Sequence, residues 1–153
     1  MSDERHLKFE IVGTDESIDL SKSMTLLKMK IVKAGGENID DNVEVDMTNH
    51  AGATMFEKIE IGLGSTMDNL VNIDCYHYIS YLESKLLNSD DYNRTSETLS
   101  GYYDDTPKQF DNLTDANLGF KARKEICKKS RMFQLFSKIH SVFLNQLKPL
   151  NRK

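Results

Sequence analysis

The stretch FEIVGTDESIDLSKSMTLLKMKIV, residues 9–32, decides the predicted fold. From position 27 onward, apolar residues alternate with others, and Lys28 and Lys30 lie between them. Successive side chains of a strand point to opposite faces, so the pattern predicts a half-buried strand over residues 20–32. The glycine and acidic residues at 13–17 supply a turn that separates this strand from an earlier one over 7–12.

A third segment, residues 55–63, alternates in the same way, with Lys58 and Glu60 on its polar face. Three alternating segments predict a mainly β fold with a sandwich core. The predicted core residues are Leu7, Phe9, Ile11, Leu27, Met29, Ile31, Ile59, Ile61 and Leu63.

Later segments carry different signals. Residues 76–88 predict one short helix, because Ile79, Leu82 and Leu86 have helical spacing and form one apolar stripe. We expect this aromatic-rich helix to seal one end of the sandwich. The polar residues 88–117 predict a long loop. Residues 132–147 fit either a helix or a strand by spacing alone.

Length and charge limit the possibilities further. The chain has 153 residues, with 39% hydrophobic and 29% charged residues, which suits one folded domain. Residues 121–153 carry ten Lys and Arg residues and one acidic residue, while the rest carries ten basic and twenty-three acidic ones. Such asymmetry indicates an interaction tail or docking of one half on the other. An acidic run at 40–46 lacks the spacing of a calcium-binding loop, so we expect it to be a solvated loop.

The cysteine content and the N-terminus bear on the compartment. Cys75 and Cys127 make no disulfide framework and predict reduced thiols. The charged N-terminus lacks the apolar region of a signal peptide, and no apolar run approaches the roughly 20 residues of a membrane span. We therefore expect a protein of the nucleus, the cytoplasm or a virion, neither secreted nor spanning a membrane.

No residue pattern indicates an enzyme or a cofactor. The sequence lacks a phosphate-binding loop, a dinucleotide glycine pattern, a zinc-protease motif and a nucleophile elbow. The candidate metal ligands His50, Cys75, His77 and His140 lack a zinc-binding spacing, so we predict neither a metal site nor a small-molecule substrate.

Several segments, in order, resemble the hexon-like major capsid protein of Maverick/Polinton transposons and adintovirus-type viruses. Tyr76–Leu87, YHYISYLESKLL, is similar to the family's "Y-P-Y-R-A-Y-L-E-x-L-L". One departure is Ser17, which stands where the family usually has a Tyr before its "I-D-L" segment. The other similar segments are Phe9–Gly13, Asp19–Lys22, Thr54–Gly64, Gly101–Thr106, Asn117–Arg123, Ser130–Arg131, Ile139–Phe143 and Leu150–Asn151.

The resemblance implies a partial viral-type jelly-roll sandwich over residues 7–153, after a flexible N-terminus at 1–6. The family protein is several times longer, carries two jelly rolls and forms trimers, whereas this chain ends where the family continues into further strands. The resemblance also favours a strand over about Met132–Leu144. An incomplete jelly roll exposes strand edges and apolar surface, so we expect self-association, with Met24 and Leu26 in the exposed surface.

These features support three functional hypotheses. The first is a structural capsid-type protein that associates with itself or with other capsid subunits. The second is a binding module whose basic segment contacts nucleic acid, weakly, or an acidic partner. The third is a decayed remnant without present activity. The contact residues of the second hypothesis are Lys121, Arg123, Lys124, Lys128, Lys129 and Arg131.

Overall fold

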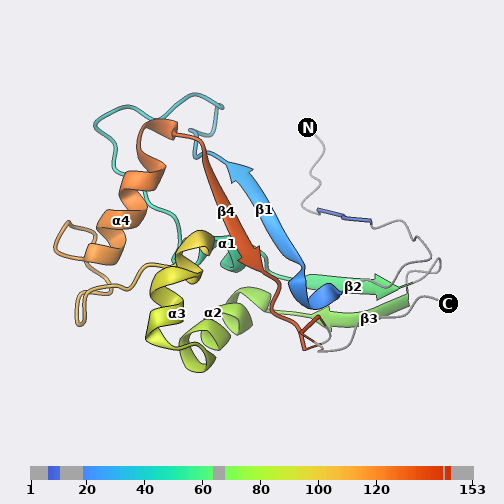
Figure 1. Ribbon diagram of the computed structural model, residues 1–153. Helices are drawn as coiled ribbons and strands as arrows, with labels where there is room; N and C mark the ends of the chain where they lie inside the picture. Colours follow the sequence, from blue (N-terminus) through green and yellow to red (C-terminus); the bar gives the residue numbers. More distant parts are fainter. Residues whose placement is uncertain (1–6, 11–18, 64–67, 143, 146–153) are drawn as a thin grey trace.

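The computed structural model describes residues 7–10, 19–63, 68–142 and 144–145, with the side chains of residues 63 and 68–70 left out. Short helices and two small sheets follow one another along the chain (Figure 1). In chain order the elements are η1 (Leu20–Lys22), β1 (Met24–Met29), α1 (Ala51–Thr54), β2 (Ile59–Leu63), β3 (Asp68–Ile73), α2 (Tyr76–Leu87), α3 (Asp90–Thr95), η2 (Glu97–Ser100), α4 (Leu118–Cys127), η3 (Lys128–Ser130) and β4 (Phe133–Lys138).

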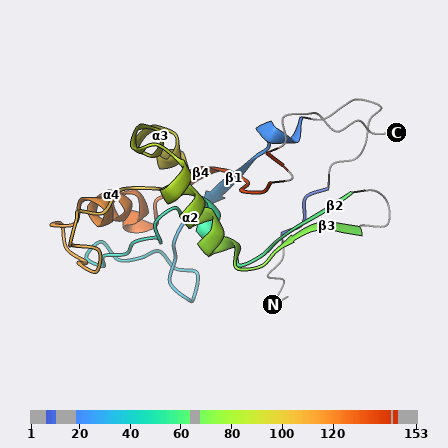
Figure 2. The ribbon, with the colours of Figure 1, turned by 90° about the horizontal axis from the view of Figure 1, so that it is seen from below.

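The four strands form two separate antiparallel pairs. β1 pairs with β4, so a segment near the start of the chain lies beside a segment near its end. In this pairing Leu26 lies opposite Phe136. β2 and β3 form a hairpin with an irregularity between Ile61 and Gly62, and this hairpin extends away from the helices (Figures 1 and 2). The predicted jelly-roll sandwich is therefore wrong: each sheet of the described residues has two strands, and helical segments hold more residues than strands do.

A small core lies between the β1–β4 sheet and the helices α1, α2 and η2. Tyr76, Tyr102 and Leu135 are its large buried apolar side chains, and many of the other buried side chains are polar. The predicted core is only partly correct. Leu7 and Phe9 are exposed, Ile11 lies outside the described residues, and nothing is described of the side chain of Leu63. The remaining predicted core residues are half-buried, namely Leu27, Met29, Ile31, Ile59 and Ile61.

Gly52 permits the close packing of α1 on its neighbours. A Cβ atom added at Gly52 would lie 3.1 Å from the carbonyl oxygen of Ser100 and 3.1 Å from Cβ of Ser137. Most side chains need more room than this, so α1 approaches η2 and β4 at a distance that favours glycine. This approach brings His50, the residue before α1, into the core, where it is fully buried.

The region predicted as a loop, 88–117, contains helices. α3 begins after Ser89, whose side chain accepts a hydrogen bond from the amide of Tyr92, and η2 follows directly. Residues 101–117 are without regular helix or strand. The prediction failed because α3 has no apolar stripe, so its only local signals were the capping residue and the charged residues of its first and last turns.

α4 was also not predicted, although its capping residue is clear. The Asn117 side chain accepts hydrogen bonds from the amides of Gly119 and Phe120. Its buried face contains Phe120, Arg123 and Cys127, so a charged residue interrupts the apolar pattern. In the ambiguous segment 132–147, residues Phe133–Lys138 form a strand, which confirms the strand prediction for that part alone.

Candidate functional site

Helix α2 is oriented with its apolar stripe toward solvent. Its buried residues are Tyr76, Ser80 and Ser84, while Leu82 is 53% exposed and Leu86 is 76% exposed. Tyr78 and Ile79 extend the same exposed stripe. The helix itself is predicted correctly, but the expectation that this stripe seals a sandwich is wrong, because the stripe faces away from the core. We call Tyr78, Ile79, Leu82 and Leu86 the α2 stripe.

The β1–β4 sheet presents a second exposed apolar surface. Met24 is 57% exposed and Leu26 is 55% exposed, as expected for the Lys28 face of this strand. Phe136 lies opposite Leu26 on the neighbouring strand and is also exposed. The other face of the sheet carries the buried Leu135 and Ser137 and packs against α1 and η2. The sheet is thus covered on one face by the described residues.

Arg123, predicted as a contact for a partner, is buried and paired within the chain. Its Nε atom lies 3.1 Å from Oδ2 of Asp46, and its Nη2 atom lies 3.2 Å from Oδ1 of Asp105. Nη1 donates a hydrogen bond to the carbonyl oxygen of Tyr103. Burial raises the pKa of Asp46, although the charge of Arg123 acts in the opposite direction.

The other predicted contact residues divide into paired and exposed ones. Lys124 lies 2.9 Å from Glu44 and also contacts Asp115, and Lys129 lies 2.7 Å from Asp41. Lys128 lies 3.3 Å from Glu125 in the same helical region. Lys121 and Arg131 are exposed. Much of the basic segment therefore forms ion pairs with the acidic run at 40–46. This agrees with the expectation that the basic part of the chain docks on the acidic part.

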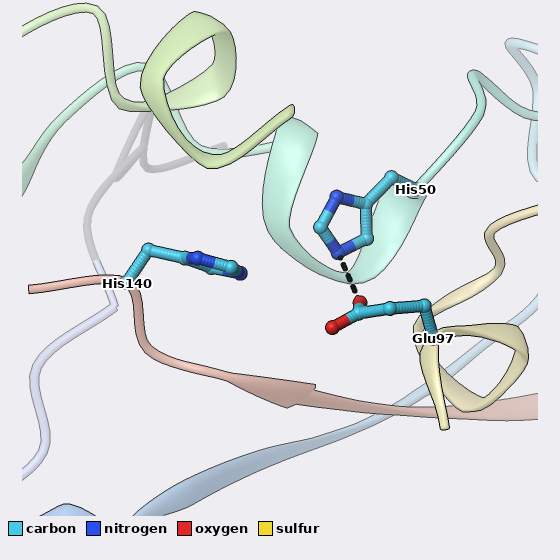
Figure 3. A group of neighbouring side chains, drawn as sticks. All are labelled: His50, Glu97 and His140. Atoms are coloured by element: carbon cyan, nitrogen blue, oxygen red, sulfur yellow. Dashed lines mark ion pairs between the residues drawn. The ribbon is translucent and has the colours of Figure 1, made fainter. Parts of the chain in front are cut away.

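A cluster of ionisable side chains lies inside the core, formed by His50, Glu97 and His140 (Figure 3). Their exposed fractions are 0%, 6% and 8%. One candidate ligand atom from each residue lies within 4.8 Å of the other two, and Nε2 of His50 lies 3.0 Å from Oε2 of Glu97. The residues come from the start of α1, the start of η2 and the segment after β4, so only the tertiary fold brings them together.

Helix α2 holds both imidazole rings through their Nδ1 atoms. Nδ1 of His140 lies 3.0 Å from Oε2 of Glu83, and Nδ1 of His50 lies 3.5 Å from Oγ of Ser84. Both Nε2 atoms are buried and have no hydrogen-bond partner among the described residues. The 3.0 Å contact to Glu97 is thus an ion-pair distance without hydrogen-bond alignment.

Burial and charge shift the pKa values of this cluster. Burial lowers the pKa of His140, and the hydrogen bond that its ring makes to the Glu83 carboxylate opposes this without reversing it. Burial acts to raise the pKa of Glu97, but the contact with His50 and the hydrogen bond from Ser100 lower it overall. The arrangement therefore favours a neutral His140 beside an ionised Glu97.

The structure separates the four candidate metal ligands of the sequence analysis. It brings His50 and His140 together, with ring centroids 5.7 Å apart. Cys75 is exposed before α2, and the His77 ring lies against Tyr78. Glu97 and Glu83 were missed because nothing in the sequence distinguishes them from the other acidic residues.

Comparisons with known proteins found no matching family model, no matching curated protein and no matching solved structure. None of the helices in the described part of the chain is both long and apolar enough to cross a membrane.

Proposed function

We propose that this chain is a non-enzymatic structural subunit that associates with further copies of itself through the α2 stripe. The observation that carries the proposal is the orientation of α2, whose apolar residues face solvent while its serines face the core. Contiguous exposed apolar surface marks interaction sites in soluble proteins. Covering it would contribute about 25 cal/mol per Å² of apolar area removed from water.

The spacing of the stripe favours a second copy of the chain as its occupant. Tyr78, Leu82 and Leu86 lie four residues apart, so they are distributed evenly about Leu82. Two such helices pack antiparallel about a two-fold axis near Leu82, with Tyr78 of each copy beside Leu86 of the other. Contacts of this isologous kind are the commonest in soluble oligomers. The unpaired edges of β1 and β4, as far as the chain is described, offer a further contact for assembly.

The capsid-type role rests on the resemblance of ordered sequence segments and not on the fold. The segment Tyr78–Glu83 forms the middle of α2, and Ile139–His140 directly follows β4. The resemblance supports a structural role in a virus-type shell, without the jelly roll. The internal pairing of Arg123, Lys124 and Lys129 supports docking of the basic segment on the chain itself, in place of a nucleic-acid contact.

Light scattering coupled to size-exclusion chromatography tests self-association. We expect the mass of the wild-type protein to rise with concentration, and Leu82→Glu to remain monomeric with an unchanged circular dichroism spectrum. Leu113→Glu is the matched control, because Leu113 is 72% exposed outside α2, and it should associate like the wild type. A wild-type protein that stays monomeric at millimolar concentration contradicts the proposal.

A further inference from the structure

We propose that His50, Glu97 and His140 form a binding site for a zinc-class divalent cation inside the core. Two imidazole nitrogens and one carboxylate are a common zinc donor set, with a fourth position left for water or another ligand. The three side chains are nearly fully buried and come from three separate parts of the chain. The inference is independent of self-association, because the α2 stripe lies on the opposite face of its helix.

The orientation of the rings is the first argument for this site. A zinc-bound histidine usually engages its other ring nitrogen with a carboxylate, a carbonyl or a water molecule, which fixes the ring. Glu83 does this for His140 at 3.0 Å, and Ser84 approaches the equivalent nitrogen of His50 at 3.5 Å. Nε2 of His140 therefore remains for a ligand, and Nε2 of His50 faces the Glu97 carboxylate at 3.0 Å. In Figure 3 the His140 ring points toward Glu97.

The cost of the arrangement without a ligand is the second argument. Nε2 of His140 is buried with no hydrogen-bond partner in the described part of the chain, whereas Nε2 of His50 has the 3.0 Å ion-pair contact with Glu97. Buried polar atoms almost always have a partner, because an unpaired one loses its hydration without compensation. His50 also has a φ of 62°, in the left-handed region that is uncommon for a residue with a side chain. Such strain tends to occur at functional sites.

The distances fit a zinc ion after a small adjustment. Zinc bonds of about 2.0–2.1 Å in a tetrahedron place donor atoms roughly 3.3 Å apart. The His50–Glu97 pair already meets this value at 3.0 Å, and all three donor atoms lie within 4.8 Å of each other. Binding of the ion therefore requires a shift of up to roughly 1.5 Å in the donor positions, which we expect the side-chain torsions to supply. The high burial favours a structural ion that holds α1, η2 and the segment after β4 together over a catalytic ion.

Calorimetric titration of the untagged, chelator-treated protein with Zn²⁺ tests the site. We expect one ion per chain, a higher thermal midpoint with Zn²⁺, and the visible absorption of four-coordinate cobalt when Co²⁺ replaces zinc. Glu97→Gln should weaken binding at least tenfold, and Glu83→Gln by about 10–100-fold, since it loosens the His140 ring. His77→Gln and Cys75→Ser lie outside the cluster and should bind like the wild type.

Two outcomes would overturn the site. One is a wild-type protein that binds no Zn²⁺ at about 100 μM, a concentration that saturates ordinary protein zinc sites. The other is binding that survives Glu97→Gln and Glu83→Gln but disappears in Cys75→Ser, which would place the ion at the exposed thiol. Glu83 is one-third exposed, so Glu83→Gln gives a folded variant for this test even where Glu97→Gln disrupts the core.

Discussion

The guanidinium of Arg123 and the carboxylate of Asp46, 77 residues apart in sequence, form a buried ion pair at 3.1 Å. Asp105, 18 residues before Arg123, contacts the same guanidinium at 3.2 Å. This contact attaches α4 to the acidic segment before α1 and to the loop after η2. A charged side chain of the buried face of α4 therefore joins this helix to two other segments of the chain.

Replacing Arg123 by Met should destabilise the protein strongly. The variant leaves the half-buried carboxylates of Asp46 and Asp105 without their cation, and breaking a fully buried pair in this way costs about 3–5 kcal/mol, which sets the upper limit here. Urea denaturation followed by circular dichroism measures the loss. Lys121→Met is the matched control, because Lys121 is an exposed residue of the same helix, and it should change stability by less than about 0.5 kcal/mol.

A double variant separates the charge effect from the packing effect. Adding Asp46→Asn to Arg123→Met removes one of the two uncompensated carboxylates, so it should recover part of the lost stability. If Asp46→Asn lowers the stability of Arg123→Met by as much as it lowers the stability of the wild type, the two residues act independently and the ion pair is not the source of the effect.

The two cysteines should react at very different rates with a thiol reagent. Cys75 is exposed, whereas Cys127 has no exposed surface and its pKa is raised by burial to about 11. A thiol reacts as its thiolate, so Cys127 should stay unmodified in the native protein at about pH 8. Ellman's reagent should detect one fast thiol per native chain and two in denaturant. Cys75→Ser should remove the fast reaction, and a native Cys127 that reacts as fast as Cys75 contradicts the packing of α4.

Local periodicity predicted the elements whose pattern is regular. The alternation around Leu27 and Ile61 lies in β1 and β2, and the aromatic segment forms α2. In α2, however, pattern alone did not determine which face is buried. Ser84 of α2 faces inward, where its Oγ atom lies 3.5 Å from Nδ1 of the buried His50, and this contact joins residues that are distant in sequence.

The candidate metal cluster was only half visible in the sequence. His50 and His140 stood out as rare residues, but no spacing joined them to Glu97 or to Glu83. Helix α4 was missed for the same reason. Arg123 occupies a buried position of this helix, and a recognisable helical pattern would need an apolar residue there. In both places polar groups form the interior, and hydrophobic patterns do not report on such interiors.

Alkaline pH should destabilise the protein through Tyr76 and Cys127. Burial raises the pKa of Tyr76 to about 12 and that of Cys127 to about 11. Above about pH 9 to 10 the unfolded chain loses these protons while the folded chain keeps them, so stability falls as pH rises toward the folded-state values. Tyr76 contributes up to about 2–3 kcal/mol to this loss of folding stability. Urea midpoints between about pH 8 and pH 11 measure the slope, which should be shallower in Tyr76→Phe and in Cys127→Ala.

Self-association through the α2 stripe should have a defined geometry. An antiparallel contact of two α2 stripes places the two copies of Leu82 next to each other at the two-fold axis. Leu82→Cys in a Cys75→Ser background should therefore form a disulfide-linked dimer under mild oxidation, since a disulfide needs Cα atoms about 4.4–6.8 Å apart. Leu86→Cys in the same background is the control, because its partner across the axis is Tyr78 and not Leu86. Non-reducing electrophoresis distinguishes the two variants. Equal cross-linking at both positions, or at Leu86 alone, would contradict the two-fold arrangement even where light scattering shows association.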